Sequence, residues 1–420
     1  MKEKLIIKNF AGIDNLELEL NQINILFGPQ ASGKSVCAKL LYYFKNFPFD
    51  IFETIIDNEG GKREFDSAIK KRFNEYFPAR SRGSSNFLIR YESGNTFIEV
   101  KKIQSKPNVK IDYANFYKML INQSRSLYRK LSNKSVNNAL DNRYARDETK
   151  KIILEEIQNE LGFTSGNNQY FIPAGRSFYA NLKKNIFSFI SNKNELDPFI
   201  VKFGSIYEDI KEFHSSGWAI TKDVPIKKEL RALERKILKG DYVKEKNKEF
   251  IVQLDKRKVE VSNTSSGQQE ALPLLTILEI ITFATAGKNG GTIYIEEPEA
   301  HLFPSGQKLI VDFIAKVFNC SKSPLQFVIT THSPYILTSL NNLLYAGWLE
   351  DTIQDDKFEK LYDVVSENTI IQPGILNSFS LHDKTCEKIQ CDEYGIIPGD
   401  IIDSASDEIA QQFDRLLDLE

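Results

Sequence analysis

The segment from Gly28 to Ser35 reads GPQASGKS and has the residue types that bind a phosphate group. Its glycines let backbone N–H groups curl around phosphate oxygens, and a helix that starts within the segment would add partial positive charge. Lys34 is expected to reach the β- and γ-phosphates of a nucleotide, and the Ser35 hydroxyl to ligate Mg²⁺. The predicted nucleotide-binding residues are Gly28, Pro29, Gln30, Ala31, Ser32, Gly33, Lys34, Ser35 and Val36.

The segments on both sides of this loop predict the elements that position it. Residues 22–27 (QINILF) are typical of a short apolar strand, and residues 36–44 (VCAKLLYYF) carry apolar residues at helical spacing. A chance glycine-rich turn is the alternative interpretation. The order strand, loop, helix is the context that a phosphate-binding loop needs, and it favours the functional interpretation.

A second candidate group lies at residues 292–301, which read TIYIEEPEAH. An apolar strand that ends in acidic residues brings a carboxylate beside a phosphate-binding loop, where Mg²⁺ lies. Glu296 is predicted to be the acid on the metal side, acting through a water molecule. Glu297 is predicted to polarise the attacking water as a general base. An exposed acidic loop after a buried strand is the alternative.

Two shorter segments complete the set of candidate residues. Ser265, Ser266, Gly267 and Gln268 stand directly before a long apolar segment, where hydroxyl and backbone N–H groups can bind phosphate, although Ser-Gly also caps helices. His332 ends the apolar segment VITTH and is predicted to contact the γ-phosphate. A lone histidine at such a position is usually structural, and the prediction depends on the strand with tandem acids that precedes it.

The order of these four motifs resembles that of the ATP-binding-cassette (ABC) class. The N-terminal KLIIKNFAGIDNLELEL and the string EEPEAHLFPSGQ are more similar to the branch that contains RecF, the SMC heads and the overcoming-lysogenization-defect (OLD) ATPases. The EEPEAH form resembles ATPase subunits of bacterial antiphage systems such as PARIS and Septu. The resemblance covers residues 1–50 and 260–345 and is weak from 110 to 250.

This resemblance implies that two heads pair head to head and hold ATP between them. Residues 265–268, the signature loop of the class, would meet the γ-phosphate of the partner's ATP. Glu297 would be the base and His332 the γ-phosphate sensor. The glutamine of the usual Q-loop is not evident, and Arg176 is the candidate for a related linking role. The candidates for contacting the base or the ribose are Lys8, Asn15 and Gln22.

Strands that alternate with helices around the phosphate-binding loop predict an α/β fold, an ABC-type P-loop ATPase head. We expect a split core: an N-terminal ATPase part (1–108), a helical insertion (109–250), a C-terminal ATPase part (251–345) and a small acidic C-terminal lobe (346–420). Within these parts, residues 343–349 are expected to form a strand and residues 404–420 a helix with one apolar face.

Charge is unevenly distributed, although the formal net charge of the 420 residues is −2. Residues 101–134 contain nine basic residues and one acid, whereas residues 346–420 contain 18 acids and 5 bases. Such a chain can present one face to a polyanion and another to a basic partner, or both segments can be solvated surfaces.

The cysteines and the apolar segments indicate whether the chain can bind zinc, be secreted or cross a membrane. The four cysteines lack zinc-like spacing, and reduced thiols are expected, including Cys386 and Cys391. No secretory signal is recognised at the N-terminus. The longest apolar stretch, 271–286, is interrupted by Pro273 and Glu279 and is too short to span a membrane. We therefore expect a cytoplasmic protein that does not act at a membrane.

Two functional hypotheses follow. The leading one is an ATP-hydrolysing subunit that acts as sensor or scaffold in an antiphage system, forms a homodimer or larger homo-oligomer, and controls a separate effector such as a nuclease. The alternative is a RecF-like DNA-binding ATPase of repair or recombination. The insertion is too short for an SMC-type coiled coil, and residues 346–420 lack the acidic pattern of a TOPRIM nuclease.

Overall fold

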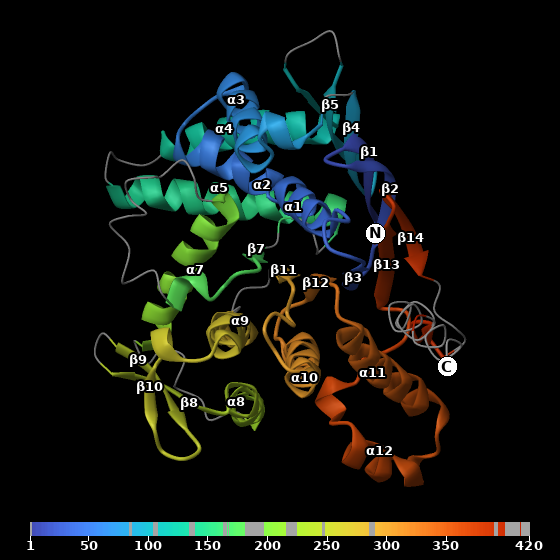
Figure 1. Cartoon of the computed structure of the whole chain (residues 1–420). Helices are drawn as coiled ribbons and strands as arrows, with labels where there is room; N and C mark the ends of the chain where they lie inside the picture. Colours follow the sequence, from blue (N-terminus) through green and yellow to red (C-terminus); the bar gives the residue numbers. More distant parts are fainter. Residues whose placement is uncertain are drawn as a thin grey trace.

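The computed structural model describes residues 2–83, 86–103, 108–133, 139–162, 166, 168–180, 197–215, 225–245, 248–284, 290–389, 394–399 and 412. Its centre is an eleven-stranded mixed sheet (Figure 1). Along the sheet the strands are β6 (Lys110–Tyr113), β5 (Thr96–Lys102), β4 (Phe87–Ser93), β1 (Glu3–Phe10), β2 (Ile13–Leu20), β14 (Thr385–Ile389), β13 (Leu376–His382), β3 (Ile23–Phe27), β12 (Leu325–Thr331), β11 (Gly291–Glu296) and β7 (Asn168–Ile172).

The half of the sheet from β13 to β7 is parallel, and it positions the candidate site. β3 pairs with β13 and β12, and β11 pairs with β12 and β7, all in parallel. Every residue of β11 and β12 is buried, in agreement with the apolar centres of their sequences, IYI and FVI. Because the carboxyl ends of parallel strands meet at one edge of a sheet, the segments that follow β3, β11 and β12 lie together.

Helices cover both faces of the sheet, and Figure 1 shows one layer above it and one below. The upper layer contains α1 (Lys34–Lys45), α2 (Phe47–Ile51), α3 (Lys62–Tyr76), α4 (Asn115–Ser132) and α5 (Ala139–Leu161). The lower layer contains α8 (Pro225–Leu238), α9 (Ser266–Ala284), α10 (Pro304–Cys320), α11 (Pro334–Thr352) and α12 (Phe358–Val364). The remaining elements at this end are α7 (Pro198–Ser215) and a small sheet of β8 (Gly240–Glu245), β9 (Lys248–Gln253) and β10 (Lys258–Glu260).

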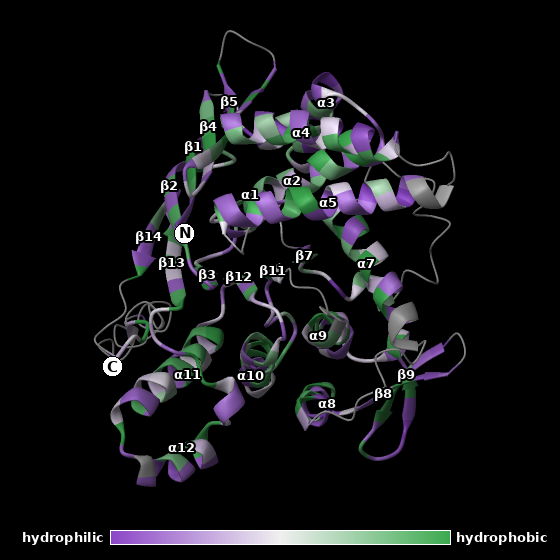
Figure 2. Ribbon diagram, turned by 180° about the vertical axis from the view of Figure 1, so that it is seen from behind, coloured by the Kyte–Doolittle hydropathy of each residue, from purple (hydrophilic) through white to green (hydrophobic). Residues whose placement is uncertain are grey.

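Two buried apolar clusters correspond to these two layers. One joins β1 and β2 to α1–α5, and the other joins β11 and β12 to α9, α10 and α11. The apolar colour of α9 and α10 in Figure 2 reflects this burial. Layers of helices on both faces of a sheet are the arrangement expected of an α/β fold, and the predicted fold class is confirmed.

The strands of the large sheet come from every part of the chain. β7 lies within residues 109–250 and forms one edge of the sheet, so a core strand interrupts this largely helical segment. β13 and β14 lie within residues 346–420 and stand between β3 and β2. The boundaries of the four parts stay predictions. The expected helix at 404–420 lies outside the described residues, apart from position 412.

The expected strand at 343–349 is wrong, because these residues belong to α11. Leu340, Leu343, Leu344 and Gly347 recur at helical spacing and are buried. The same run of apolar residues also fits a buried strand, so its composition alone did not distinguish the two.

A buried ion pair joins the first strand to the end of α1. Lys45 Nζ lies 2.8 Å from Glu3 Oε2 and donates to Gln326 Oε1 at 2.6 Å. Both charged side chains are nearly inaccessible, at 2% for Lys45 and 3% for Glu3. Burial lowers the pKa of Lys45, while the neighbouring carboxylate of Glu3 raises it.

We expect Lys45→Ala to lower the free energy of unfolding by about 3–5 kcal/mol, because it removes the positive charge that pairs with the buried Glu3 carboxylate. Urea denaturation of the purified chain measures this. The double variant Glu3→Gln, Lys45→Met is the control, since it removes both charges and should cost much less. Equal losses for the two variants would contradict the interpretation.

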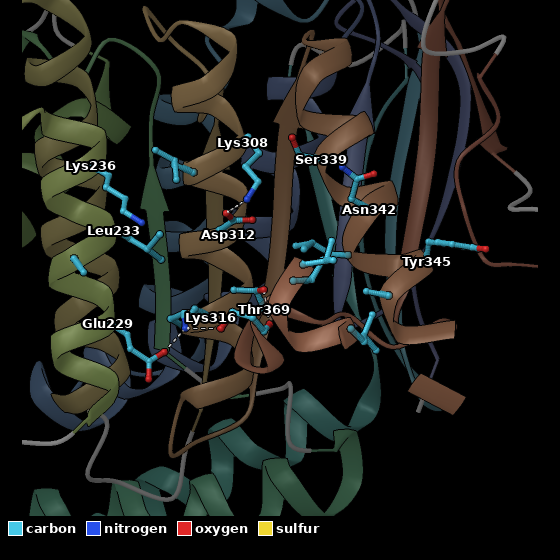
Figure 3. Close-up of a pocket in the computed structure, with 18 of the residues that line it drawn as sticks. Glu229, Leu233, Lys236, Lys308, Asp312, Lys316, Ser339, Asn342, Tyr345 and Thr369 are labelled. Carbon is cyan, nitrogen blue, oxygen red and sulfur yellow. Dashed lines mark hydrogen bonds and ion pairs between the residues drawn. The ribbon is translucent and has the colours of Figure 1, made fainter. Parts of the chain in front are cut away.

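A groove of about 680 Å³ opens between α8, α10, α11 and α12, on a surface that contains none of the candidate site residues (Figure 3). Lys316 pairs with Glu229 across it, and Lys308 donates to Asp312 at 2.6 Å. The rest of its lining is largely apolar, including Leu233 of α8. The groove therefore lies where α8 and α10 face α11 and α12.

None of the described helices is both long and apolar enough to cross a membrane. Cys37, Cys320 and Cys386 are free thiols, and Cys391 lies outside the described residues. Burial raises the pKa of the Cys386 thiol to about 12, so this cysteine stays protonated at neutral pH.

Candidate nucleotide-binding site

The loop between β3 and α1 needs glycine at its two ends. Gly28 has φ +150°, and a Cβ there would lie 2.2 Å from the carbonyl oxygen of Leu381 on β13. Gly33 has φ +100°, and a Cβ there would lie 2.8 Å from Cδ1 of Ile13. A larger residue would collide with backbone at position 28, and at position 33 it would press on the Ile13 side chain and adopt a φ that L-residues seldom have. β13 and Ile13, the first residue of β2, therefore pack directly against the loop.

Lys34 begins α1 and is turned back over the loop. Its Nζ donates to the carbonyl oxygens of Gly28 at 2.7 Å and Pro29 at 2.6 Å. The side chain is 6% exposed, and burial lowers its pKa, while the carboxylates of Glu297 and Glu299 raise it. The ammonium group is therefore held at the mouth of the loop, on the side of the acidic segment.

Glu296, the last residue of β11, can hold a cation together with Ser35. Its Oε2 accepts from the backbone N–H of Ala174 at 3.3 Å, and its buried Oε1 has no hydrogen-bond partner among the described residues. Burial raises the pKa of Glu296, while Lys39 and the nearby Ser35 hydroxyl lower it. A carboxylate oxygen that accepts no hydrogen bond can bind a cation, and here it lies near a hydroxyl group. These two oxygen ligands fit Mg²⁺, which takes its other ligands from phosphates and water.

Glu297 and His332 converge at the same edge of the sheet. His332 Nδ1 lies 3.8 Å from Glu297 Oε1 and 3.4 Å from Glu299 Oε1. The side chains of Glu297 and His332 are 35% and 40% exposed, whereas Glu299 is 4% exposed. Two partly exposed groups therefore face the site, and a buried carboxylate stands behind the histidine.

Sequence reasoning assigned no role to Glu299, although it lies within the EEPEAH string. Its Oε1 accepts from the Thr331 hydroxyl at 2.7 Å and from the backbone N–H of His332 at 2.9 Å. This carboxylate fixes the end of β12 and the direction of the histidine. The spacing of two residues from Glu297 was a usable signal, because a second acid in the loop can reach the neighbouring strand.

The backbone of Glu297 is held in an unusual conformation. Its φ is +45°, in the left-handed region that non-glycine residues seldom adopt. Its N–H donates to the carbonyl oxygen of Thr330 at 2.9 Å, and its carbonyl oxygen accepts from Arg176 Nη2 at 3.0 Å. Strained backbone of this kind persists only where surrounding contacts fix it, and it clusters at functional sites.

Residues 265–268 lie against the segment that follows Glu297. A Cβ on Gly267 would lie 2.6 Å from the carbonyl oxygen of His301. The Ser265 hydroxyl donates to Gln268 Oε1 at 3.1 Å, and Gln268 Nε2 donates to the carbonyl oxygen of Leu238 at 2.5 Å. Within the described residues, no hydrogen bond or ion pair joins this loop to Gly28–Ser35 of the same chain.

We expect Gly267→Ala to weaken ATP-dependent self-association while leaving ATP binding by the single chain unchanged. The added methyl group would push the loop away from His301, whereas Lys34 and its loop are untouched. Light scattering with and without ATP measures the association, and nucleotide titration measures the binding. Gly306→Ala, where the nearest atom would be at 3.6 Å, is the control. Unchanged association of Gly267→Ala would contradict this prediction.

The three candidates for contacting the base or the ribose, among them Gln22, stay predictions. Gln22 precedes β3, whereas the phosphate-binding loop follows it, and five strand residues separate the two ends by about 16 Å. Lys8 and Asn15 are paired across β1 and β2. Both lie on the strands beside Ile13, which contacts Gly33.

The comparisons with known proteins agree with this geometry. The family model described as "AAA ATPase domain" matches residues 1–337, which include all four motifs. The chain belongs to this family. A search of curated proteins found no match. This AAA ATPase domain protein is therefore an ATPase, as its P-loop and tandem acids predicted.

Three solved structures illustrate its similarity to SMC heads. An SMC head bound to the C-terminal winged-helix domain of ScpA is 12% identical (TM-score 0.41; 92% of this chain and 96% of that chain covered). The SMC head domain from Thermotoga maritima is 9% identical (TM-score 0.36; 93% of this chain and 99% of that chain covered). An SMC head domain with an extended coiled coil, bound to the C-terminal domain of ScpA and derived from Pyrococcus furiosus, is 11% identical (TM-score 0.37; 92% of this chain and 95% of that chain covered). The TM-scores lie below 0.5, and the assignment rests on the family match.

Proposed function

We propose that this chain binds ATP with Mg²⁺ between two copies of itself and hydrolyses it slowly, as the sensor or scaffold subunit of a bacterial antiphage system. The observation that carries the catalytic proposal is the meeting of Glu296, Glu297 and His332 at the edge of the sheet where the phosphate-binding loop opens. Two copies are proposed because residues 265–268 contact His301 and Leu238 rather than their own phosphate-binding loop.

In the proposed reaction, Lys34 and the backbone N–H groups of residues 28–35 bind the β- and γ-phosphates. Ser35 and Glu296 would hold Mg²⁺, which when bound neutralises phosphate charge. Glu297 takes the proton of the attacking water, since its carboxylate is partly exposed. His332 turns Nδ1 toward Glu299, and when both ring nitrogens carry a proton Nε2 can donate to the γ-phosphate.

The defence role is proposed from the form of the acidic segment and from what the chain provides. The string EEPEAH resembles ATPases of antiphage systems, and residues 346–420 carry an excess of acids that a basic partner can bind. The described residues include no cluster of three or more His, Cys, Asp or Glu side chains that could hold a metal ion. We therefore propose that a separate effector protein, a nuclease, performs the toxic reaction.

Co-expression with the adjacent gene product tests this role. We expect the two proteins to purify together, and we expect cells to be protected from phage by the pair but not by a pair that carries Lys34→Ala. Absence of co-purification together with full protection by Lys34→Ala would overturn the defence proposal.

A RecF-like DNA-binding ATPase is the second candidate, because α4 exposes Arg129 and Lys130. Part of the basic stretch is neutralised, since Lys101 donates to Glu99 at 2.8 Å and Lys110 lies 2.8 Å from Asp112. ATP-dependent binding to duplex or gapped DNA, with an affinity that falls steeply with salt, would favour this candidate. The variant Arg129→Ala, Lys130→Ala should then reduce the salt slope.

A further inference from the structure

Arg176 is completely buried at the point where three functional segments meet. It follows β7, its side chain is 0% exposed, and it is among the largest side chains with so little surface. Burial lowers its pKa, while the carboxylates of Glu270, Glu299 and Glu296 raise it. A buried guanidinium is costly unless its donors are satisfied, so its partners indicate what it holds in place.

On one side, Arg176 holds the backbone that carries the two catalytic carboxylates. Nη1 donates to the carbonyl oxygen of Glu296 at 2.7 Å, and Nη2 donates to that of Glu297 at 3.0 Å. The same segment holds the Glu296 side chain through the N–H of Ala174. Because Glu297 has φ +45°, its carboxylate direction depends on these contacts.

On the other side, the same residue is joined to the helix that begins with the signature loop. Its N–H donates to Glu270 Oε2 at 2.9 Å, and its Nε donates to the carbonyl oxygen of Glu270 at 3.0 Å. The N–H of Ser177 donates to the other carboxylate oxygen of Glu270 at 3.0 Å. Glu270 is 1% exposed and lies in the first turns of α9, so it moves with Ser265–Gln268.

We propose that Arg176 is a positioning residue that couples the signature loop to Glu297 of the same chain. Ser265–Gln268 meets the ATP of a second copy, and Arg176 transmits the resulting position of α9 to the base at the chain's own ATP. Hydrolysis at one site then depends on ATP at the other. This inference rests on the proposed pairing of two copies.

Steady-state kinetics of Arg176→Lys tests the coupling, because lysine keeps the charge but cannot reach both carbonyl oxygens and Glu270 at once. We expect kcat to fall about 10- to 100-fold, the effect of misplacing a catalytic group by about 1 Å. The ATP affinity of the single chain should stay unchanged, and the rate should lose its cooperative dependence on ATP concentration.

Two further variants keep the test decisive. Glu270→Gln retains the shape of the glutamate and removes its charge. We expect its kcat to fall and its cooperativity to be lost, as in Arg176→Lys. This variant tests the coupling even if Arg176→Lys does not fold. Arg231→Lys is the matched control, because Arg231 lies 3.7 Å from Glu279 of the same α9 but is 52% exposed. It should behave like the parent chain.

The outcomes separate this inference from the proposed function. A folded Arg176→Lys or Glu270→Gln chain that hydrolyses ATP as fast and as cooperatively as the parent would overturn the coupling. A slower variant that keeps its cooperativity would also overturn it, since Arg176 would then only support the fold. A parent chain that stays monomeric in ATP and shows no cooperativity would instead refute the pairing of two copies.

Discussion

Glu297→Gln is expected to lower kcat for ATP hydrolysis by about 10²–10⁴-fold, the usual contribution of a positioned general base. Glutamine keeps the size of the side chain but cannot accept the proton of the attacking water. The backbone contacts of residue 297 with Thr330 and Arg176 do not involve the carboxylate, so the fold should be retained.

The same variant should bind ATP as tightly as the parent chain, because Lys34 and the phosphate-binding loop are unchanged. ATP that binds and is not hydrolysed would then hold the copies together, so the assembled form should accumulate. Single-turnover hydrolysis and light scattering in ATP measure the two effects. Glu359→Gln, on an exposed position of α12, is the control. Unchanged hydrolysis in Glu297→Gln would show that another group is the base.

The residues of this site could be found from the sequence because each stands in a local pattern. The loop at Gly28–Ser35 lies between an apolar strand and a helix, and Glu296 and Glu297 end a strand that is buried along its whole length. Local patterns of this kind depend on a few adjacent residues. The parallel register of β3, β12 and β11 then brings the separate patterns to one edge, which confirms the α/β prediction.

What connects these patterns could not be predicted with the same certainty. The contact between Arg176 and Glu270 joins residues 94 positions apart, and the contact between Arg176 and Glu297 spans 121. Neither residue stands in a spacing that indicates its partner. The position of β13 beside Gly28 could not be predicted either, since the sequence LNSFSLH does not indicate that this strand pairs in parallel with β3.

The helix at 343–349 shows a different limit. A short apolar run fits both a buried strand and a buried helix, and the distinction depends on the whole of α11 rather than on the run itself. In the folded chain Leu343 and Leu344 belong to the apolar cluster that joins β11 and β12 to α9, α10 and α11, and the helix places both of them there. The composition of this segment therefore did not determine which element it forms.

Lys34→Ala is expected to weaken ATP binding by about 10- to 150-fold, which corresponds to the 1.5–3 kcal/mol of a hydrogen bond to a charged group. The ammonium group is the one positive side chain within Gly28–Ser35, and it is held at the mouth of the loop by two carbonyl oxygens. Its loss removes the charge that meets the β- and γ-phosphates.

Lys34→Met separates this effect from damage to the fold, because methionine keeps an unbranched apolar stem at this position and removes only the charge. We expect both variants to unfold at a temperature close to that of the parent without ATP. At the same ATP concentration, the rise in unfolding temperature that ATP gives the parent chain should be smaller in both variants, since stabilisation by a ligand grows with the logarithm of its concentration divided by Kd. Lys71→Ala, whose side chain is 79% exposed on α3, should keep the full rise. A rise in Lys34→Met as large as in the parent chain would mean that the backbone N–H groups of the loop, and not the lysine, dominate binding of the phosphates.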